Sequence, residues 1–354
     1  MNKIEKAVFP VGGMGTRFLP ATKASPKEML PIVDKPLIQY AAEEAIAAGI
    51  TELIFVTGRT KQSITEHFSN ANSLEAELEK QGKLKELEAV RSIIPDNISC
   101  KYITQSEPLG LGHAVLCAKS AVGNHPFALI LPDDLIEDGT RGVTKQLVKR
   151  YEKTNNSIIA VENVCKKDLS KYGIVGISQE VEKNLFYITG IVEKPKPKHA
   201  LSTLGVVGRY ILCPQIFDCL ENTEKGAEDE IQLTDAIGML LDKQSIHAYK
   251  FEGTRYDCGS KLGYIQASIQ YALNDFDIGK RHNLEFINIL EKDGTLNSYA
   301  EKISSLLSQT HIDAINIPEV HDEGGRGERL LAQMGRPECF SGGRQGNRMD
   351  TREV

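Results

Sequence analysis

Apolar residues along the first half of this chain fall into short continuous runs, separated by stretches with helical spacing. The runs Ala7–Val11, Leu53–Thr57 and Phe127–Leu131 have the length and character of strands that are buried on both faces. Between the first two, Leu37–Ala48 has helical spacing and is followed by Gly49, a typical helix stop. The alternation predicts an α/β fold, with a mostly parallel sheet and helices on both of its faces.

The second half of the chain shows the same two kinds of pattern. Strands are predicted at Ser157–Val161, Ile188–Val192 and Val206–Leu212, and helices at Ile231–Leu241 and Leu262–Leu273. In sheets of this kind, ligands bind at the carboxyl ends of the strands. Residues that directly follow a predicted strand are therefore the first candidates for a functional site.

Residues Asn70–Arg91 are charged and helix-prone, and their apolar stripe is broken. We interpret this segment as a pair of solvated surface helices, with a partner-binding face as the alternative.

Near Ile315 the composition of the chain changes, and His321–Val354 is rich in glycine and arginine with few large apolar residues. Such a segment buries too little surface to offset its ordering entropy. We therefore divide the chain into a main domain (1–275), a helical extension (276–314) and a disordered or atypical tail (315–354).

Composition excludes several classes of protein. The 354 residues are 41% hydrophobic and 25% charged, as in ordinary globular proteins, and the net charge is −6. A negative balance argues against a nucleic-acid or anionic-membrane partner, and no apolar run is long enough to span a membrane. The first ten residues are too few and too polar for a signal peptide, and the seven cysteines are scattered without a C-x-x-C pair. We expect reduced thiols and a cytoplasmic protein.

The first strand leads into a turn that contains Gly12, Gly13 and Gly15. Successive peptide N–H groups in such a turn point to one place and favour an anion there. Arg17 and Lys27 follow closely and add full positive charge. The segment therefore predicts a polyphosphate site.

Two common types of phosphate loop do not fit this turn. A dinucleotide fingerprint needs a small residue where Phe18 stands, counting from Gly13, and a P-loop needs a GK[ST] sequence, which the chain lacks.

Elsewhere, Asp133 and Asp134 follow a predicted strand, as Mg²⁺ ligands do, although a turn or helix cap is the common alternative. His113 invites interpretation as a general base, but we expect it to be structural.

Taken together, the motifs resemble those of the sugar-1-phosphate nucleotidylyltransferases. The resemblance begins with the string VGGMGTRFLPATKASPKEMLPIVDKP over Val11–Pro36 and continues, in order, through GLGHAV, LPD, YG, EKP, GVVGRY, DEIQLTDA and DCG. It covers Lys6–Tyr271 and implies a Rossmann-like nucleotide-diphospho-sugar transferase fold, with one mixed, mainly parallel sheet. The segment PKEMLPIVDKPLIQY is most similar to the uridylyl-transferring branch.

The resemblance implies transfer of the uridylyl group of UTP to α-D-glucose 1-phosphate, which yields UDP-glucose and pyrophosphate. Mg²⁺ is the implied cofactor. The attacking sugar phosphate is already an anion, so the reaction requires positioning and charge neutralisation rather than a general base. Two alternatives stay open: the same chemistry with dTTP or another sugar 1-phosphate, and a non-catalytic regulatory homologue.

The resemblance also implies a set of site residues. Its catalytic cations are Arg17, Lys27 and Lys194, and its metal ligands are Asp133 and Asp257. Its nucleotide-binding residues are Gly12, Gly13, Gly15, Thr16, Glu28, Gln105 and Gly110. Its sugar-phosphate-binding residues are Gly173, Glu193, Lys194 and Val206. A homodimer or homotetramer is expected, without nucleic-acid or membrane partners.

Overall fold

The computed structural model describes residues 3–58, 62–69, 71–138, 142–226 and 229–281, with the backbone alone for 274–281. The chain divides into one compact unit over Met1–Ala272 and a second that begins at Leu273. The predicted tail (315–354) and most of the predicted extension (276–314) lie outside the described residues.

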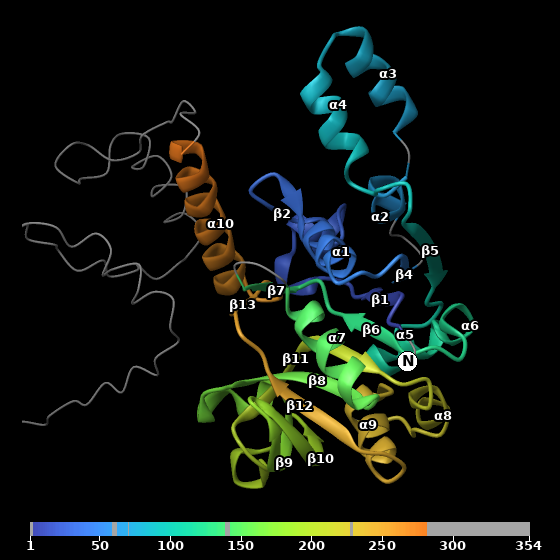
Figure 1. The fold of residues 1–354 in the computed structure, drawn as a ribbon, viewed down its shortest axis with the longest axis vertical. Coiled ribbons are helices and arrows are strands. Elements are labelled where there is room, and N and C mark those ends of the chain that lie inside the picture. Colours follow the sequence, from blue (N-terminus) through green and yellow to red (C-terminus); the bar gives the residue numbers. More distant parts are fainter. Residues whose placement is uncertain (1–2, 59–61, 70, 139–141, 227–228, 282–354) are drawn as a thin grey trace, which may run out of the picture. The chain divides into compact units, whose positions relative to one another are not determined.

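A nine-stranded mixed sheet forms the centre of the first unit (Figure 1). In spatial order its strands are β5 (Ser99–Thr104), β4 (Glu52–Thr57), β1 (Lys6–Val11), β6 (Phe127–Ile130), β11 (Leu204–Leu212), β8 (Ser157–Asn163), β12 (Ile246–Lys250), β10 (Leu185–Glu193) and β9 (Gly173–Glu182). The first four are parallel, and β8 is parallel to β12, whereas β11 and β10 run antiparallel to their neighbours. The mixed sheet and all six predicted strands are confirmed.

Two short ribbons accompany the sheet. In one, β2 (Pro31–Ile32) pairs with β3 (Lys35–Pro36), and in the other, β7 (Asp134–Glu137) pairs with β13 (Thr254–Asp257). The helices are α1 (Leu37–Ala47), α2 (Gln62–His67), α3 (Asn72–Lys80), α4 (Leu84–Arg91), α5 (Gly110–Cys117), α6 (Lys119–Val122), α7 (Val143–Thr154), α8 (Ile216–Glu221), α9 (Leu233–Leu241) and α10 (Lys261–Arg281). Short 3₁₀ turns lie at Thr16–Phe18, Ala21–Lys23, Lys27–Met29, Lys166–Lys171 and Pro197–His199.

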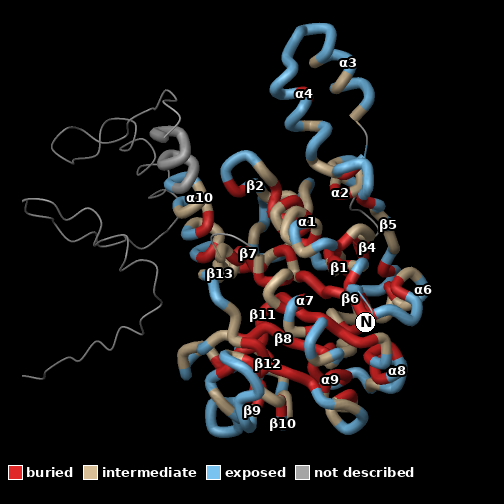
Figure 2. The backbone as a smooth tube through the Cα atoms, viewed as in Figure 1, coloured by how far each residue is buried: buried red, intermediate tan, exposed pale blue. Residues whose placement is uncertain are grey.

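Helices pack on both faces of the sheet, as the strand–helix alternation predicts. Successive side chains of β1 point to opposite faces. Phe9 belongs to an apolar cluster with Ile38 of α1 and Leu147 of α7, whereas Val8 belongs to a second cluster with Val115 of α5. The central strands are accordingly buried along their length (Figure 2).

The helix pair α3–α4 is a surface element, as we expected (Figure 2). Helix α3 has no buried residue and α4 has one, Leu87. Leu74 and Leu84 are exposed, and Arg91 Nε donates to Glu75 Oε2 over 2.8 Å across the pair. Charged contacts in solvent therefore take the place of an apolar core in this segment.

The strand order gathers four loops at one edge of the sheet. Because β5, β4, β1 and β6 are parallel neighbours, their carboxyl ends lie side by side. The next residues along the chain are, respectively, Gln105, Gly58, Gly12 and the turn that contains Asp133. The topology alone thus brings segments together that are more than a hundred residues apart in the sequence.

A second feature brings the far end of the sheet to the same region. Strand β9 pairs with β10 and also with β11, where Ile174 lies opposite Gly205. Since Glu193 of β10 lies opposite Gly173 of β9, both residues are held next to the start of β11. The sheet therefore supplies a second wall from residues 173–206.

Most of the cysteines in the described residues are free thiols: Cys100, Cys117, Cys213, Cys219 and Cys258. Within the described part of the chain, no helix is both long and apolar enough to cross a membrane.

His247 on β12 is an unusual core residue. Its side chain is 1% exposed and packs against the Tyr187 ring at 4.8 Å, and neither ring nitrogen has a hydrogen-bond partner among the described residues. Burial lowers the pKa of His247, because the charged imidazolium would lose its hydration.

We predict that His247 makes stability fall on acidification. The unfolded chain takes up a proton at His247 below a pH of about 6.5, whereas the folded chain resists it, so the free energy of unfolding should drop by up to about 1.4 kcal/mol per pH unit. Urea unfolding at pH 5 and pH 7.5 would measure the drop. His247→Leu, which cannot titrate, should have a smaller pH dependence, and an unchanged dependence would contradict the assignment.

Candidate functional site

The glycine turn after β1 is shaped by close contacts. A Cβ on Gly12 would lie 2.6 Å from Gln105 Oε1, so only glycine fits there without displacing that side chain. Gly15 has a φ of +64°, which favours glycine, and its carbonyl accepts a hydrogen bond from Thr22 Oγ1 at 2.7 Å. Gly13 and Thr16, also predicted for the nucleotide, are exposed in the same loop.

Gln105 and Gly110, which lie five residues apart in the sequence, contact each other. The backbone N–H of Gln105 continues the edge of the sheet by donating to Thr57 O at 2.8 Å. Its side-chain Nε2 donates to Gly110 O at 3.2 Å and lies 3.0 Å from His113 Nδ1. His113 therefore helps to orient Gln105, which agrees with the structural role that we expected.

Lys27 lies beside Asp133, across the gap between the first loop and the end of β6. Lys27 Nζ is 2.5 Å from Asp133 Oδ2, and the neighbouring Glu28 is buried. Burial opposes charge on Lys27, but Asp133 and Glu28 outweigh it and raise the lysine pKa. Burial likewise opposes charge on Asp133, but Lys27 outweighs it and lowers the pKa of that carboxyl. Both groups are therefore ionised at neutral pH.

The side chains of Asp133 and Asp257 both lie next to Gly259. A Cβ on Gly259 would be 3.0 Å from Asp133 Oδ2 and 3.0 Å from Asp257 Oδ1, so these two oxygens are no more than about 6 Å apart. The backbone fixes this arrangement, because Cys258 N donates to Asp133 O at 2.7 Å. Arg17 reaches the same place, with its Nη1 3.4 Å from Gly259 O.

The carboxylates of this region repel one another. Burial, followed by the nearby Asp134, raises the pKa of Asp257, and Asp133 raises it further, while Arg255 opposes the rise. Among the described residues, no group of three or more His, Cys, Asp or Glu side chains has the arrangement of a metal site. Asp133 and Asp257 therefore lie together as a pair of carboxylates rather than within a larger group of such side chains in the described part of the chain.

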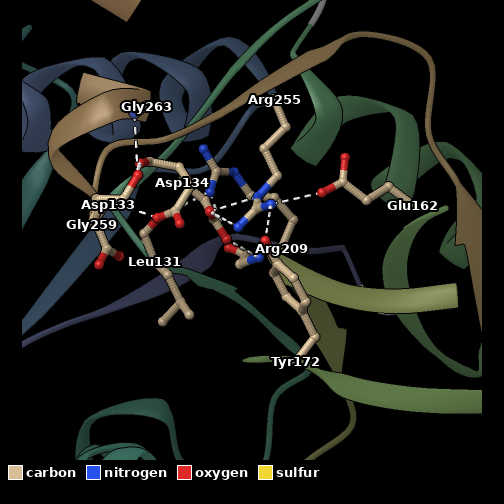
Figure 3. A network of polar contacts seen from close by, with 12 residues as sticks. Leu131, Asp133, Asp134, Glu162, Tyr172, Arg209, Arg255, Gly259 and Gly263 are labelled. Atoms are coloured by element: carbon tan, nitrogen blue, oxygen red, sulfur yellow. Dashed lines mark hydrogen bonds and ion pairs between the residues drawn. The ribbon is translucent and has the colours of Figure 1, made fainter. Parts of the chain in front are cut away.

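Arg255 is the centre of a polar network close to Asp133 and Asp134 (Figure 3). Its guanidinium contacts Asp134 Oδ1 and Glu162 Oε1, each at 2.6 Å, and donates to Tyr172 Oη at 3.3 Å. Asp134 also accepts a hydrogen bond from Gly208 N at 2.7 Å. Asp134 is thus engaged in structure, as we expected from its position next to Asp133.

A second buried arginine, Arg209 of β11, fixes the end of β6. Its Nη1 donates to Leu131 O at 3.0 Å (Figure 3). Its Nη2 lies 2.7 Å from Glu44 Oε2, and the side chains of Arg209 and Glu44 are 2% and 9% exposed. Glu44 Oε1 also accepts hydrogen bonds from the N–H and the hydroxyl of Thr144. Burial opposes charge on Glu44, but Arg209 and Thr144 outweigh it, and the pKa of Glu44 is lowered.

The sequence-based prediction missed both arginines, although each had a signal. Arg209 interrupts an otherwise apolar strand that reads as buried, and a buried charge needs a partner. Arg255 precedes Asp257 by two residues on a strand, so the two side chains point to the same side. These signals indicate a polar contact but do not name the partner.

The predicted sugar-phosphate residues come together on β9, β10 and β11. A Cβ on Gly173 would lie 3.3 Å from Glu193 Oε2, 3.8 Å from Val206 Cγ2 and 2.8 Å from Thr234 Cγ2. Thr234 Oγ1 donates to Glu193 Oε2 at 3.1 Å. Lys194 has a φ of +42°, unusual for a residue with a side chain, and its Nζ is 3.6 Å from Glu193 Oε1.

One cleft of about 670 Å³ joins these groups. Of the predicted site residues, its lining includes Arg17, Asp133, Gly173, Glu193, Lys194, Val206 and Asp257. Lys27 reaches it through its contact with Asp133. Gln105 and Gly110 do not line the cleft. Gly110 packs against Glu230, however, and Glu230 does line it. The cleft thus combines cations, a carboxylate pair and a polar wall in a volume that suits a small-molecule ligand.

Comparison with known proteins identifies what the chain resembles. Residues 6–274 match the model of a family described as nucleotidyl transferase. A UTP–glucose-1-phosphate uridylyltransferase of Staphylococcus epidermidis is 50% identical over 275 residues, which cover 78% of this chain and 94% of that protein. An enzyme of the same name from Bacillus subtilis is 48% identical over 279 residues, which cover 78% and 94%.

Solved structures agree with these relatives. A UDP-glucose pyrophosphorylase in complex with UDP-glucose is 45% identical with a TM-score of 0.71, over 77% of this chain and 99% of that one. A UTP-bound UGPase from Acinetobacter baumannii is 45% identical with a TM-score of 0.72, over 77% and 94%.

The Arg209–Glu44 pair leads to a prediction about stability. Arg209→Met should lower the free energy of unfolding by roughly 3–5 kcal/mol, because the Glu44 carboxylate would stay buried without its cation. Urea unfolding would measure the loss. Lys153→Met is the matched control, since it removes the exposed pair to Glu182 (2.7 Å) and should change little. Equal effects of the two substitutions would contradict the role of Arg209.

Proposed function

The chain belongs to the nucleotidyl transferase family, and we propose that it transfers the uridylyl group of UTP to α-D-glucose 1-phosphate. The products are UDP-glucose and pyrophosphate. The observation that carries the proposal is the cleft, which has Arg17, Asp133 and Asp257 on one side and Glu193 and Lys194 on the other. A two-substrate reaction between polyanions needs such facing groups.

The nucleotide occupies the loop side of the cleft. The glycine turn presents backbone N–H groups to the triphosphate, and Arg17 and Lys27 neutralise its charge. Gln105 and Gly110 contact the uracil, and Glu28 supports the same site from its buried position. An amide side chain offers both a donor and an acceptor, which suits the N3–H and O4 edge of uracil.

Asp133 and Asp257 are the residues that would hold a Mg²⁺ ion. They fit, because they are a close pair of carboxylates and the pKa of Asp257 is raised by burial and by its acidic neighbours, so a cation there offsets unfavourable charge. Mg²⁺ is commonly bound by one or two carboxylates together with substrate phosphates. When bound, it stabilises the negative charge that develops on the phosphates.

The sugar phosphate occupies the opposite wall. Lys194 binds its phosphate group, Glu193 contacts sugar hydroxyls, and Gly173 and Val206 lie against the sugar ring. An oxygen of the sugar phosphate attacks the α-phosphorus of UTP and forms the new phosphoanhydride bond. The bond from the α-phosphorus to the bridging oxygen breaks, and pyrophosphate leaves with its electron pair. Since the nucleophile is an anion, the side chains of the cleft position and neutralise rather than remove a proton.

The homodimer or homotetramer and the cytoplasmic location remain predictions from the sequence. Gel filtration with light scattering would measure the assembly directly. The proposed reaction does not depend on either, because every side chain assigned above comes from this one chain.

A pyrophosphate-release assay tests the proposed reaction. Purified protein with Mg²⁺, UTP and glucose 1-phosphate should release pyrophosphate, and omission of either substrate should abolish release. A panel with dTTP, which has an added methyl and lacks the ribose 2′-hydroxyl, and with other sugar 1-phosphates would establish the preferences. We expect UTP and glucose 1-phosphate to give the highest kcat/KM. An absence of release with every combination would overturn the proposal.

Asp133→Asn and Asp257→Asn should each lower kcat on the order of 10²-fold or more, because each removes a charged ligand from the proposed Mg²⁺ site. The assay above measures the loss. Asp218→Asn on α8, an exposed carboxylate whose side chain is 66% accessible, is the matched control and should turn over normally. Near-normal turnover in either cleft variant would remove that residue from the metal site.

A further inference from the structure

The carboxylate of Glu193 is held from two sides. Thr234 Oγ1 donates a hydrogen bond to Oε2 at 3.1 Å, and Lys194 Nζ lies 3.6 Å from Oε1. The Thr234 residue is 8% exposed, whereas the Lys194 side chain is 51% exposed. The threonine contact is therefore fixed by packing, and the lysine contact is free to change.

The fold places Thr234 for this contact. Thr234 is the second residue of α9, whose N-cap is Gln232. Its Cγ2 lies 2.8 Å from the position that a Cβ on Gly173 would occupy, so the missing side chain of Gly173 makes room for it. The methyl packs against β9, and the hydroxyl is thereby turned toward Glu193.

The single proton of the Thr234 hydroxyl is used in the hydrogen bond to Glu193. Because Glu193 Oε2 is a carboxylate oxygen, Thr234 must be the donor in this hydrogen bond. A hydrogen bond to a charged acceptor is stronger than one between neutral groups and holds the carboxylate in one orientation. The remaining lone pairs of Glu193 then point in fixed directions into the cleft, which both residues line.

We propose that Thr234 is a positioning residue for the sugar, acting through Glu193. This inference rests on the proposed function, in which Lys194 binds the sugar phosphate and Glu193 contacts the sugar hydroxyls. When Lys194 turns to the phosphate, its contact with Glu193 Oε1 is lost, and the Thr234 hydroxyl continues to orient the carboxylate. Glucose is recognised by a carboxylate that is already in place before the sugar arrives.

Steady-state kinetics with three variants test the inference. Thr234→Val keeps the shape but removes the hydroxyl, so the KM for glucose 1-phosphate should rise about tenfold or more, while the KM for UTP stays the same. Thr234→Ser keeps the hydroxyl and should restore most of the loss. Thr223→Val is the matched control, because its hydroxyl donates to Cys219 O at 2.8 Å outside the cleft. It should leave both constants unchanged.

A binding measurement separates this inference from the proposed reaction. Calorimetric titration with UDP and with UDP-glucose gives the gain in affinity due to the glucose group, without turnover. That gain should shrink about tenfold in Thr234→Val and persist in Thr234→Ser and Thr223→Val. Absence of pyrophosphate release in the unaltered protein would overturn the reaction alone. An unchanged gain in Thr234→Val, or equal losses in the valine and serine variants, would overturn the role of Thr234.

Discussion

The buried contact between Arg209 and Glu44 is the constraint on which the site depends. Arg209 lies on β11, Glu44 on α1, and Thr144, which also donates to Glu44, on α7. The same guanidinium donates to Leu131 O, two residues before Asp133. One side chain therefore ties two helices to the end of β6 and sets where the Asp133 turn begins. A buried charge of this kind is costly to leave unpaired, so separating these four parts is energetically unfavourable.

Charge balance decides what the cleft can bind. Four carboxylates gather at one side of it: Asp133, Asp134, Glu162 and Asp257. Arg255 is paired with Asp134 and Glu162, and Lys27 with Asp133. Burial and acidic neighbours nevertheless raise the pKa values of Asp257 and Glu162. The network around Arg255 thus concentrates the excess negative charge next to Asp133. This negative charge favours a cation at that place, while Arg17 and Lys194 at the borders favour phosphate groups.

The helices and strands, and the phosphate-binding character of the glycine turn, could be predicted from the sequence, because each depends on residues that are close together along the chain. Buried strands such as β1 read as continuous apolar runs, and the glycine turn stood out by composition. The pairing of Asp133 with Asp257 required the resemblance, since a separation of more than a hundred residues has no local signature. The role of Thr234 has no signature in its motif DEIQLTDA, although its hydroxyl contacts Glu193 and it lines the cleft. A contact made by a small neutral side chain has no pattern until the fold is known.

Missing side chains explain how residues so far apart meet so closely. The Cβ position of Gly12 lies 2.6 Å from Gln105 Oε1, and that of Gly259 lies 3.0 Å from both Asp133 Oδ2 and Asp257 Oδ1. The Cβ position of Gly173 lies between Thr234 and Glu193. An alanine at any of these positions would place its Cβ in close contact with neighbouring side chains of the proposed site. The glycines therefore specify the site as strongly as the charged residues, because each removes the atom that would keep two functional side chains apart.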